Sequence, residues 1–207
     1  NIERSNMEVL AIASEGKVVY GITTGFGILA NTHISEEDTR LLQHKILQSH
    51  SVGVGNPIPD EVAKLMLITK VHALARGYSG VQLSTLERIC WHIENDAIPV
   101  VPEKGSVGAS GDLAPLAHLF LPLVGLGECT WQGRRYSSSM LLREVGLEPI
   151  VLGPKEGLAL INGTQFILAF AVKAVQMLHN CLEAADIIGA MSLESLTGTK
   201  APFDERL

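Results

Sequence analysis

The sequence is poor in aromatic and charged residues, and its cysteines form no recognisable pattern. Aromatic residues make up 5% of the 207-residue chain and charged residues 18%, whereas 46% of the residues are hydrophobic. This balance excludes a disordered chain and favours a globular protein with buried helices. Cys90, Cys129 and Cys181 are odd in number and far apart, which excludes a disulfide framework and a CxxC metal pair. Such cysteines suit a reducing compartment, so we expect a cytoplasmic protein.

The sequence also lacks an excess of positive charge and a long uninterrupted apolar run. Its formal net charge is -6, which provides no electrostatic footprint for nucleic acid or an anionic membrane. The apolar stretches 113–127 and 166–178 are too short, or too interrupted by proline, glycine and Lys173, to span a bilayer. The first residues resemble an amphipathic helix and not a signal peptide. We therefore predict a soluble protein that binds neither nucleic acid nor a membrane.

The common motifs for phosphate binding, serine hydrolysis and zinc binding are absent. Neither GxGxxG nor a P-loop motif occurs. Residues 108–112 approach the G-x-S-x-G elbow of hydrolases, but Asp112 stands where the last glycine belongs. There is no HExxH motif, and the seven histidines show no metal-ligand spacing, so we predict no metal site.

Helix signals dominate the chain, and neither an internal repeat nor a low-complexity linker divides it. Leu42, Ile46 and His50 share one face of a helix that Ser35 and Asp38 would cap. We also predict helices over about 1–17, over 60–76 before Gly77, from a Ser84/Glu87 capping box to before Pro99, and over 164–196. Strand signals are weak and cover 17–20 and 128–136. The pattern predicts a single, mostly helical domain over residues 1–207.

Three glycine-rich segments are not explained by helix packing, and we predict them to be loops. They cover residues 20–27, 105–112 and 156–164, each next to a predicted element boundary. Loops at such boundaries commonly carry functional groups.

The segment Ala109-Ser110-Gly111 is able to form an electrophile without an added cofactor. The Gly111 nitrogen, unhindered by a side chain, attacks the Ala109 carbonyl if the backbone bends tightly, and the preceding glycines supply that freedom. Loss of water from the ring, and of the Ser110 hydroxyl as a second water, leaves a methylidene-imidazolone. Asp112 is placed to N-cap the following helix, so the electrophile would lie at that helix's positive end.

Four segments of the chain resemble the signature segments of the histidine and aromatic amino-acid ammonia-lyase family. They are YGITTGFG, SHSVGVG, GSVGASGDLAPLAH and EGLALINGTQ, and they occur in family order over nearly the whole chain. The resemblance implies a mainly α, helical-bundle lyase fold with a few short strands. Family chains are considerably longer, so this chain would be the N-terminal portion of a larger one. The resemblance also implies a homotetramer whose sites combine loops from several subunits.

The resemblance assigns a role to each of the conspicuous site residues. Ala109-Ser110-Gly111 would fuse autocatalytically into 4-methylidene-imidazol-5-one, with no external cofactor. Tyr20 would be the base that removes a β-proton from the amino-acid substrate, reaching the site from a different subunit than Ser110. Asn162 would hydrogen-bond at the prosthetic group and substrate, and His50 would contact the substrate side chain. The product would be ammonia and a trans-unsaturated acid.

Each of these residues also has a plain structural interpretation. His50 could be a hydrogen-bonded core histidine, Tyr20 a packed aromatic side chain, and Asn162 a turn or helix cap. His118, among leucines, is interpreted as structural, and Cys90-Trp91-His92 as packing.

The pair Ser49-His50 indicates the substrate. It resembles the Ser-His pair of histidine members, and a polar pair facing an imidazole would discriminate strongly. Thr23 stands where histidine enzymes often carry asparagine, and Thr-Thr is familiar among the aromatic lyases. We favour conversion of L-histidine to trans-urocanate. A tyrosine or phenylalanine ammonia-lyase, an aminomutase, or a catalytically incomplete oligomerising fragment remain alternatives.

Overall fold

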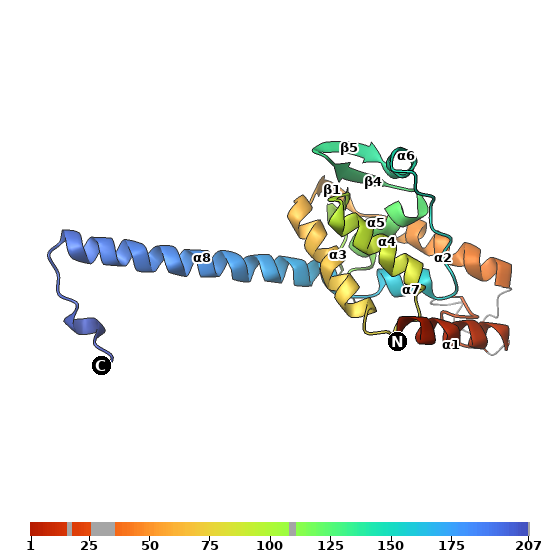
Figure 1. Cartoon of the computed structure of the whole chain (residues 1–207), viewed down its shortest axis with the longest axis horizontal. Helices are drawn as coiled ribbons and strands as arrows, with labels where there is room; N and C mark the ends of the chain where they lie inside the picture. Colours follow the sequence, from red (N-terminus) through yellow and green to blue (C-terminus); the bar gives the residue numbers. More distant parts are fainter. Residues whose placement is uncertain (16–17, 26–35, 108–110, 207) are drawn as a thin grey trace. The chain divides into compact units, whose positions relative to one another are not determined.

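The computed structural model describes residues 1–15, 18–25, 36–107 and 111–206 and is dominated by helices (Figure 1). The chain divides into two compact units, Asn1–Ala169 and Phe170–Leu207. The mainly α fold class with a few short strands is confirmed. The single domain over 1–207 stays a prediction.

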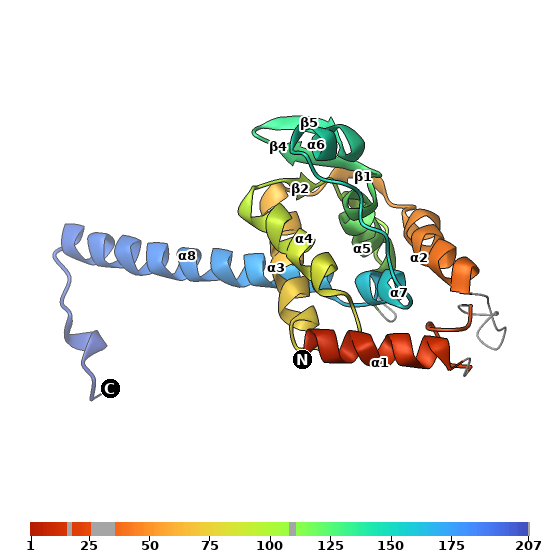
Figure 2. The same ribbon diagram turned by 45° about the vertical axis from the view of Figure 1, so that its right-hand side comes forward.

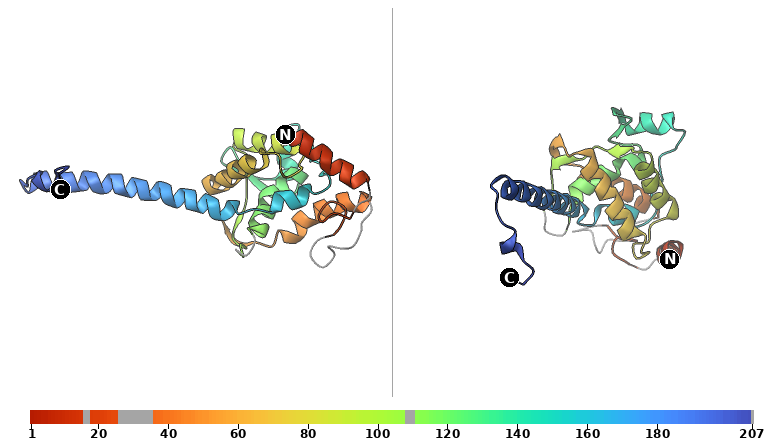
Figure 3. Two further views of the ribbon diagram at one scale, coloured as in Figure 1. Left: turned by 90° about the horizontal axis from the view of Figure 1, so that it is seen from below. Right: turned by 60° about the vertical axis from the view of Figure 1, so that its left-hand side comes forward.

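The helices of the first unit pack around a main hydrophobic core and a smaller apolar cluster of Ala97, Cys129 and Leu141. These helices are α1 (Ile2–Ser14), α2 (Glu36–His50), α3 (Asp60–Leu74), α4 (Leu83–Glu94), α5 (Leu113–Phe120), α6 (Ser138–Glu144) and α7 (Glu156–Ile161), with a 3-10 turn over Leu121–Val124. Helices α2, α5 and α7 pack against one another (Figure 2), and α3 packs against α4 (Figure 3). The largest fully buried apolar side chains include Leu47, Met66, Leu67, Ile89, Leu116 and Phe120.

Among the described residues of the first unit, five short strands form two antiparallel sheets. Strand β1 (Val54–Pro57) pairs with β3 (Pro102–Lys104), and β2 (Ile98–Pro99), β4 (Glu128–Trp131) and β5 (Arg134–Ser137) form the second sheet in that order. The β4–β5 hairpin turns at Gln132-Gly133, both with positive φ, as the tightest hairpin turns require. The weak strand signal over 128–136 agrees with β4 and β5, whereas β1 to β3 were not predicted because they are too short to show a period of two.

Helix α8 (Gln165–Ser195) begins in the first unit and continues through the second, which also holds a 3-10 turn over Ala201–Phe203. Its bounds confirm the predicted helix over 164–196. By length and composition alone, the helical stretch Glu156–Ser195 is apolar enough to cross a membrane, contrary to the expectation from the sequence. Core helices of soluble proteins meet the same criterion, so the absence of a membrane partner stays a prediction.

Several local predictions were wrong. Of the strand predicted over 17–20, Lys17 lies outside the described residues, and residues 18–20 form no strand, with a turn beginning at Tyr20. Helix α4 begins at Leu83 with Gln82 as its N-cap residue, so Ser84 lies inside the helix and does not cap it. Much of the segment 156–164 is helical, since α7 covers Glu156–Ile161.

Candidate functional site

A cavity of about 310 Å³ lies where the end of α2 meets the loop before α5. This volume suits a small ligand. Its lining joins two segments that the sequence analysis singled out separately, the Ser49-His50 pair and the glycine-rich loop. The lining residues are Ser49, His50, Val52, Gly105, Val107, Gly111, Leu113 and Ala114. Ala109 and Ser110, the other members of the predicted electrophile, lie outside the described residues.

His50 is the last residue of α2 and is held by its own helix. Its Nδ1 lies 2.9 Å from the Ile46 carbonyl oxygen and 3.1 Å from the Ser49 hydroxyl. A carbonyl oxygen only accepts hydrogen bonds, so Nδ1 carries a proton and, in the neutral ring, Nε2 is the nitrogen that accepts. The histidine at this cavity therefore offers an acceptor to a ligand's N–H group.

The segment after α2 is fixed by His118 of α5. The Gly53 amide donates to His118 Nε2 at 3.0 Å, and burial lowers the pKa of His118, which favours the neutral ring that this bond needs. A Cβ on Gly105 would lie 3.1 Å from the Gly53 Cα. The backbone after α2 and the backbone of the glycine-rich loop thus approach more closely than side chains would allow. His118 has a structural role, as expected, because it holds the Gly53 amide.

Gly111 rests against the backbone of Gly163. Its φ is +130°, and a Cβ here would lie only 2.3 Å from the Gly163 carbonyl oxygen. The next amide, that of Asp112, donates to the same oxygen at 2.8 Å. Only glycine fits this position, for reasons of both backbone conformation and space.

Asp112 links this loop to two helices. It is the residue before α5, but its side chain makes no hydrogen bond to that helix, which corrects the predicted capping role. The fully buried carboxylate instead accepts from the Ser106 hydroxyl at 2.6 Å and from the Ile167 amide, in the first turn of α8, at 3.1 Å. The carboxylate therefore caps α8, and the N-termini of α5 and α8 converge on the glycine-rich loop.

Asn162 lies beside this arrangement and not in the cavity lining. It ends α7, and its side-chain amide donates to the Leu158 carbonyl at 3.0 Å. Its carbonyl accepts from the Lys70 ammonium at 2.6 Å. Lys70 was missed by the sequence analysis, although one signal was available: it interrupts the buried apolar face that Met66, Leu67 and Leu74 form on α3.

Tyr20 lies in a turn that two threonines stabilise. The Thr23 hydroxyl accepts from the Val19 amide at 2.9 Å, and the Thr24 hydroxyl accepts from the Gly21 amide at 3.3 Å. Tyr20 itself is 53% exposed and is not among the residues that line the cavity. Within one chain, the described structure does not bring Tyr20 together with His50 and Gly111.

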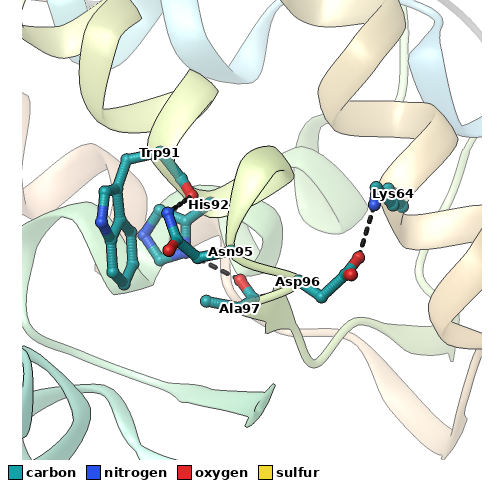
Figure 4. A network of polar contacts seen from close by, with 6 residues as sticks. All are labelled: Lys64, Trp91, His92, Asn95, Asp96 and Ala97. Atoms are coloured by element: carbon teal, nitrogen blue, oxygen red, sulfur yellow. Dashed lines mark hydrogen bonds and ion pairs between the residues drawn. The ribbon is translucent and has the colours of Figure 1, made fainter. Parts of the chain in front are cut away.

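The Trp91-His92 segment is occupied with packing (Figure 4). The two rings meet edge to face with centroids 5.1 Å apart, and His92 Nδ1 lies 2.7 Å from the Ala97 carbonyl oxygen. The neighbouring Asp96 pairs with Lys64. Among the described residues, no cluster of three or more His, Cys, Asp or Glu side chains is arranged to hold a metal ion.

Comparison with known proteins relates this arrangement to one family. The family model described as aromatic amino acid lyase matches residues 1–207. The histidine ammonia-lyase of Vibrio cholerae serotype O1 is 46% identical over 206 residues, which cover all of this chain and 40% of the relative.

Solved structures extend the similarity to the fold. The crystal structure of histidine ammonia-lyase from Trypanosoma cruzi matches with a TM-score of 0.87 and 38% identity, over 97% of this chain and 38% of that one. Tyrosine aminomutase from Streptomyces globisporus matches with a TM-score of 0.89 and 33% identity, over 97% of this chain and 38% of the other. The chain thus spans about 40% of the length of the V. cholerae relative. Since the family model covers the whole sequence, the chain belongs to the aromatic amino acid lyase family.

Proposed function

We propose that the protein is an ammonia-lyase that converts L-histidine to trans-urocanate and ammonia. The observation that supports this proposal is that His50 and Gly111 line one cavity, in a chain 46% identical to a histidine ammonia-lyase. A C–N lyase of this kind needs an electrophile and a pocket for the substrate side chain. In this proposal the glycine-rich loop, which contributes Gly111 to the cavity, supplies the electrophile. The end of α2, which contributes His50, supplies the pocket for the side chain.

The surroundings of Gly111 fit a methylidene-imidazolone formed from Ala109-Ser110-Gly111. Ring closure joins the Gly111 nitrogen to the Ala109 carbonyl carbon and releases one water, and dehydration of Ser110 releases a second. The nitrogen must belong to a residue without a side chain, and at Gly111 a Cβ would collide with the Gly163 carbonyl. The finished group supplies an electrophilic methylene that makes the substrate nitrogen a better leaving group. In this proposal neither a metal nor an external cofactor takes part.

The surrounding residues select and orient the substrate. His50 Nε2 accepts a hydrogen bond from the imidazole N–H of L-histidine, because Nδ1 is engaged with the Ile46 carbonyl. The N-termini of α5 and α8, which meet at Asp112, favour negative charge that builds up at the loop. Asn162 precedes Gly163, which contacts Gly111, and in this proposal its side-chain amide leaves the Leu158 carbonyl to hydrogen-bond at the prosthetic group and substrate.

Tyr20 serves as the base in this proposal and comes from another subunit. Its absence from the cavity lining of its own chain is consistent with that arrangement. A homotetramer, in the cytoplasm and without nucleic acid or membrane, would also cover the exposed apolar side chains of the second unit. They include Phe170, Val172, Val175, Met177, Leu178, Leu182, Ile187, Ile188 and Met191.

A tyrosine- or phenylalanine-specific lyase or an aminomutase is the second candidate. The match to a tyrosine aminomutase structure favours it, as does the Thr23-Thr24 pair. In this chain, however, both threonine hydroxyls bond the backbone of the Tyr20 turn, so the pair has a structural use that does not depend on the substrate. A catalytically incomplete oligomerising fragment is the third candidate.

Assays with three amino acids separate these candidates. The protein is incubated with L-histidine, L-tyrosine and L-phenylalanine, and ammonia, trans-unsaturated acid and β-amino acid are quantified, with S110A as the control. The proposal predicts urocanate and ammonia in equal amounts from L-histidine alone. A β-amino acid would identify a mutase, and release of cinnamate or coumarate would identify an aromatic lyase. No turnover of any of the three would favour the fragment.

A further inference from the structure

Among the described residues, the proposed site leaves one buried amine, that of Lys70, without a role. Lys70 is only 2% exposed, in the middle of the apolar face of α3. Among the described residues it has no carboxylate partner, and burial alone lowers its pKa to about 7. A buried, unpaired amine is costly. Methionine or leucine would fill the same space without that cost. A buried lysine at this position therefore indicates that its amine has a specific role.

The hydrogen bond of Lys70 leads to the electrophile loop. Its ammonium donates to the Asn162 carbonyl at 2.6 Å. The next carbonyl, that of Gly163, accepts from the Asp112 amide at 2.8 Å and is the atom that a Cβ on Gly111 would strike. Two consecutive carbonyl groups thus have different partners. The Asn162 carbonyl accepts from Lys70 of α3, and the Gly163 carbonyl accepts from the Asp112 amide of the glycine-rich loop.

We propose that Lys70 is a positioning residue, which holds the Asn162–Gly163 turn in the place where it supports the backbone of Gly111 and Asp112. Its contribution to catalysis rests on the function proposed above, whereas the holding role does not. Lysine suits the position because a neutral amine and an ammonium ion both donate to a carbonyl, so the bond persists on either side of the pKa of Lys70.

The chain offers a matched control on the same helix. Lys64 also belongs to α3, but its side chain is one-third exposed and pairs with Asp96 on the surface (Figure 4). K64M removes a lysine from α3 without touching the turn. K70M removes the donor at nearly constant volume, and K70Q keeps a polar end that is too short to reach the carbonyl. K70R restores a donor.

Amide hydrogen exchange tests the holding role directly. In K70M and K70Q the Asp112 amide should exchange at least ~10-fold faster than in the wild type, because one supporting hydrogen bond is worth about that factor. The Leu116 amide, which donates to the Asp112 carbonyl inside α5, should stay protected. K64M should match the wild type, and K70R should recover most of the protection. If K70M does not fold, the exchange rate of the Asp112 amide in K70Q is compared with that of the wild type instead. Equal Asp112 exchange in the wild type and in the folded Lys70 variants would overturn the proposal.

The mass of the folded protein tests the link to catalysis. Folded K70M should show a several-fold lower fraction of peptide 105–112 that has lost two waters, whereas K64M should show the wild-type fraction. A lysine with a merely structural role would lower the melting temperature and leave this fraction unchanged, and that result would limit Lys70 to stability. If the wild type itself keeps its full mass, the proposed function fails, and the exchange rates still decide whether Lys70 holds the turn.

Discussion

At the scale of single residues, the cavity depends on close backbone contacts that leave no space for a side chain. Gly111 is the clearest case, because its φ of +130° and the nearby Gly163 carbonyl both exclude a Cβ. The sequence analysis required a glycine here for its unhindered nitrogen. The structure adds a second reason, the close approach of the turn at the end of α7.

G111A tests this requirement. The added Cβ must displace the Gly163 backbone, so we expect a loss of about 1–3 kcal/mol in the free energy of unfolding and no loss of water from the loop. G133A is the control, because Gly133 also has positive φ but has open space around it. Urea unfolding and intact mass measure both effects. A G111A protein as stable as G133A, and still dehydrated, would refute the steric argument.

His50 tests the choice of substrate at the same scale. H50L removes the Nε2 acceptor from the cavity, so kcat/KM for L-histidine should fall by about 100-fold or more, as expected when a buried polar contact to the substrate is lost. H44L, on the same helix but outside the cavity lining, should keep the wild-type value. Steady-state kinetics decide, and an unchanged kcat/KM in H50L would remove His50 from the site.

At the scale of elements, the first turn of α8 is coupled to the loop before α5 through Asp112. The sequence showed that a helix follows Asp112 and that another begins near residue 164, and both were correct. It could not show which helix the carboxylate caps, because that depends on how α5 and α8 pack. An aspartate before a helix is normally assigned to that helix. Here tertiary packing redirects it to a helix 55 positions further along the chain.

D112A tests this coupling. Removing a buried acceptor that serves the Ser106 hydroxyl and the Ile167 amide should destabilise the protein by about 2 kcal/mol or more. The Ile167 amide should lose its protection from hydrogen exchange. D60A removes an exposed aspartate from the first turn of α3 and should cost less than about 1 kcal/mol. Equal losses in the two variants would contradict the capping role.

At the scale of the whole molecule, sequence patterns located the long helices but not the site, and the chemistry predicted for the loop at 105–112 stays a prediction. An apolar period indicated α1 and α2, capping and stop signals indicated α3 and α4, and a long apolar segment indicated α8. Strands β1 to β3 and the buried Lys70 were not predicted, since their positions are set by tertiary contacts. The cavity was equally hidden, because residues 60 positions apart meet there only after α2 and α5 have packed.

Stability against acid is a property of the whole fold, and His92 controls part of it. Burial lowers the pKa of His92 from 6.5 to about 4. Between pH 6.5 and about 4, His92 is therefore protonated in the unfolded chain but not in the native state. The free energy of unfolding falls as the pH falls through this range. The expected loss between pH 7 and pH 5 is about 2 kcal/mol. H92Q should lack this component in urea unfolding at the two pH values, and an identical pH dependence in both proteins would contradict the assignment.

In the proposed function, this chain folds so as to build its own electrophile. The most direct test is the exact mass of the purified protein, together with isolation and sequencing of the peptide that spans Gly105 to Asp112. We predict a deficit of two waters confined to Ala109-Ser110-Gly111, absent from S110A. An unmodified mass would leave the family membership intact and contradict the claim that this chain forms the catalytic group of a working lyase.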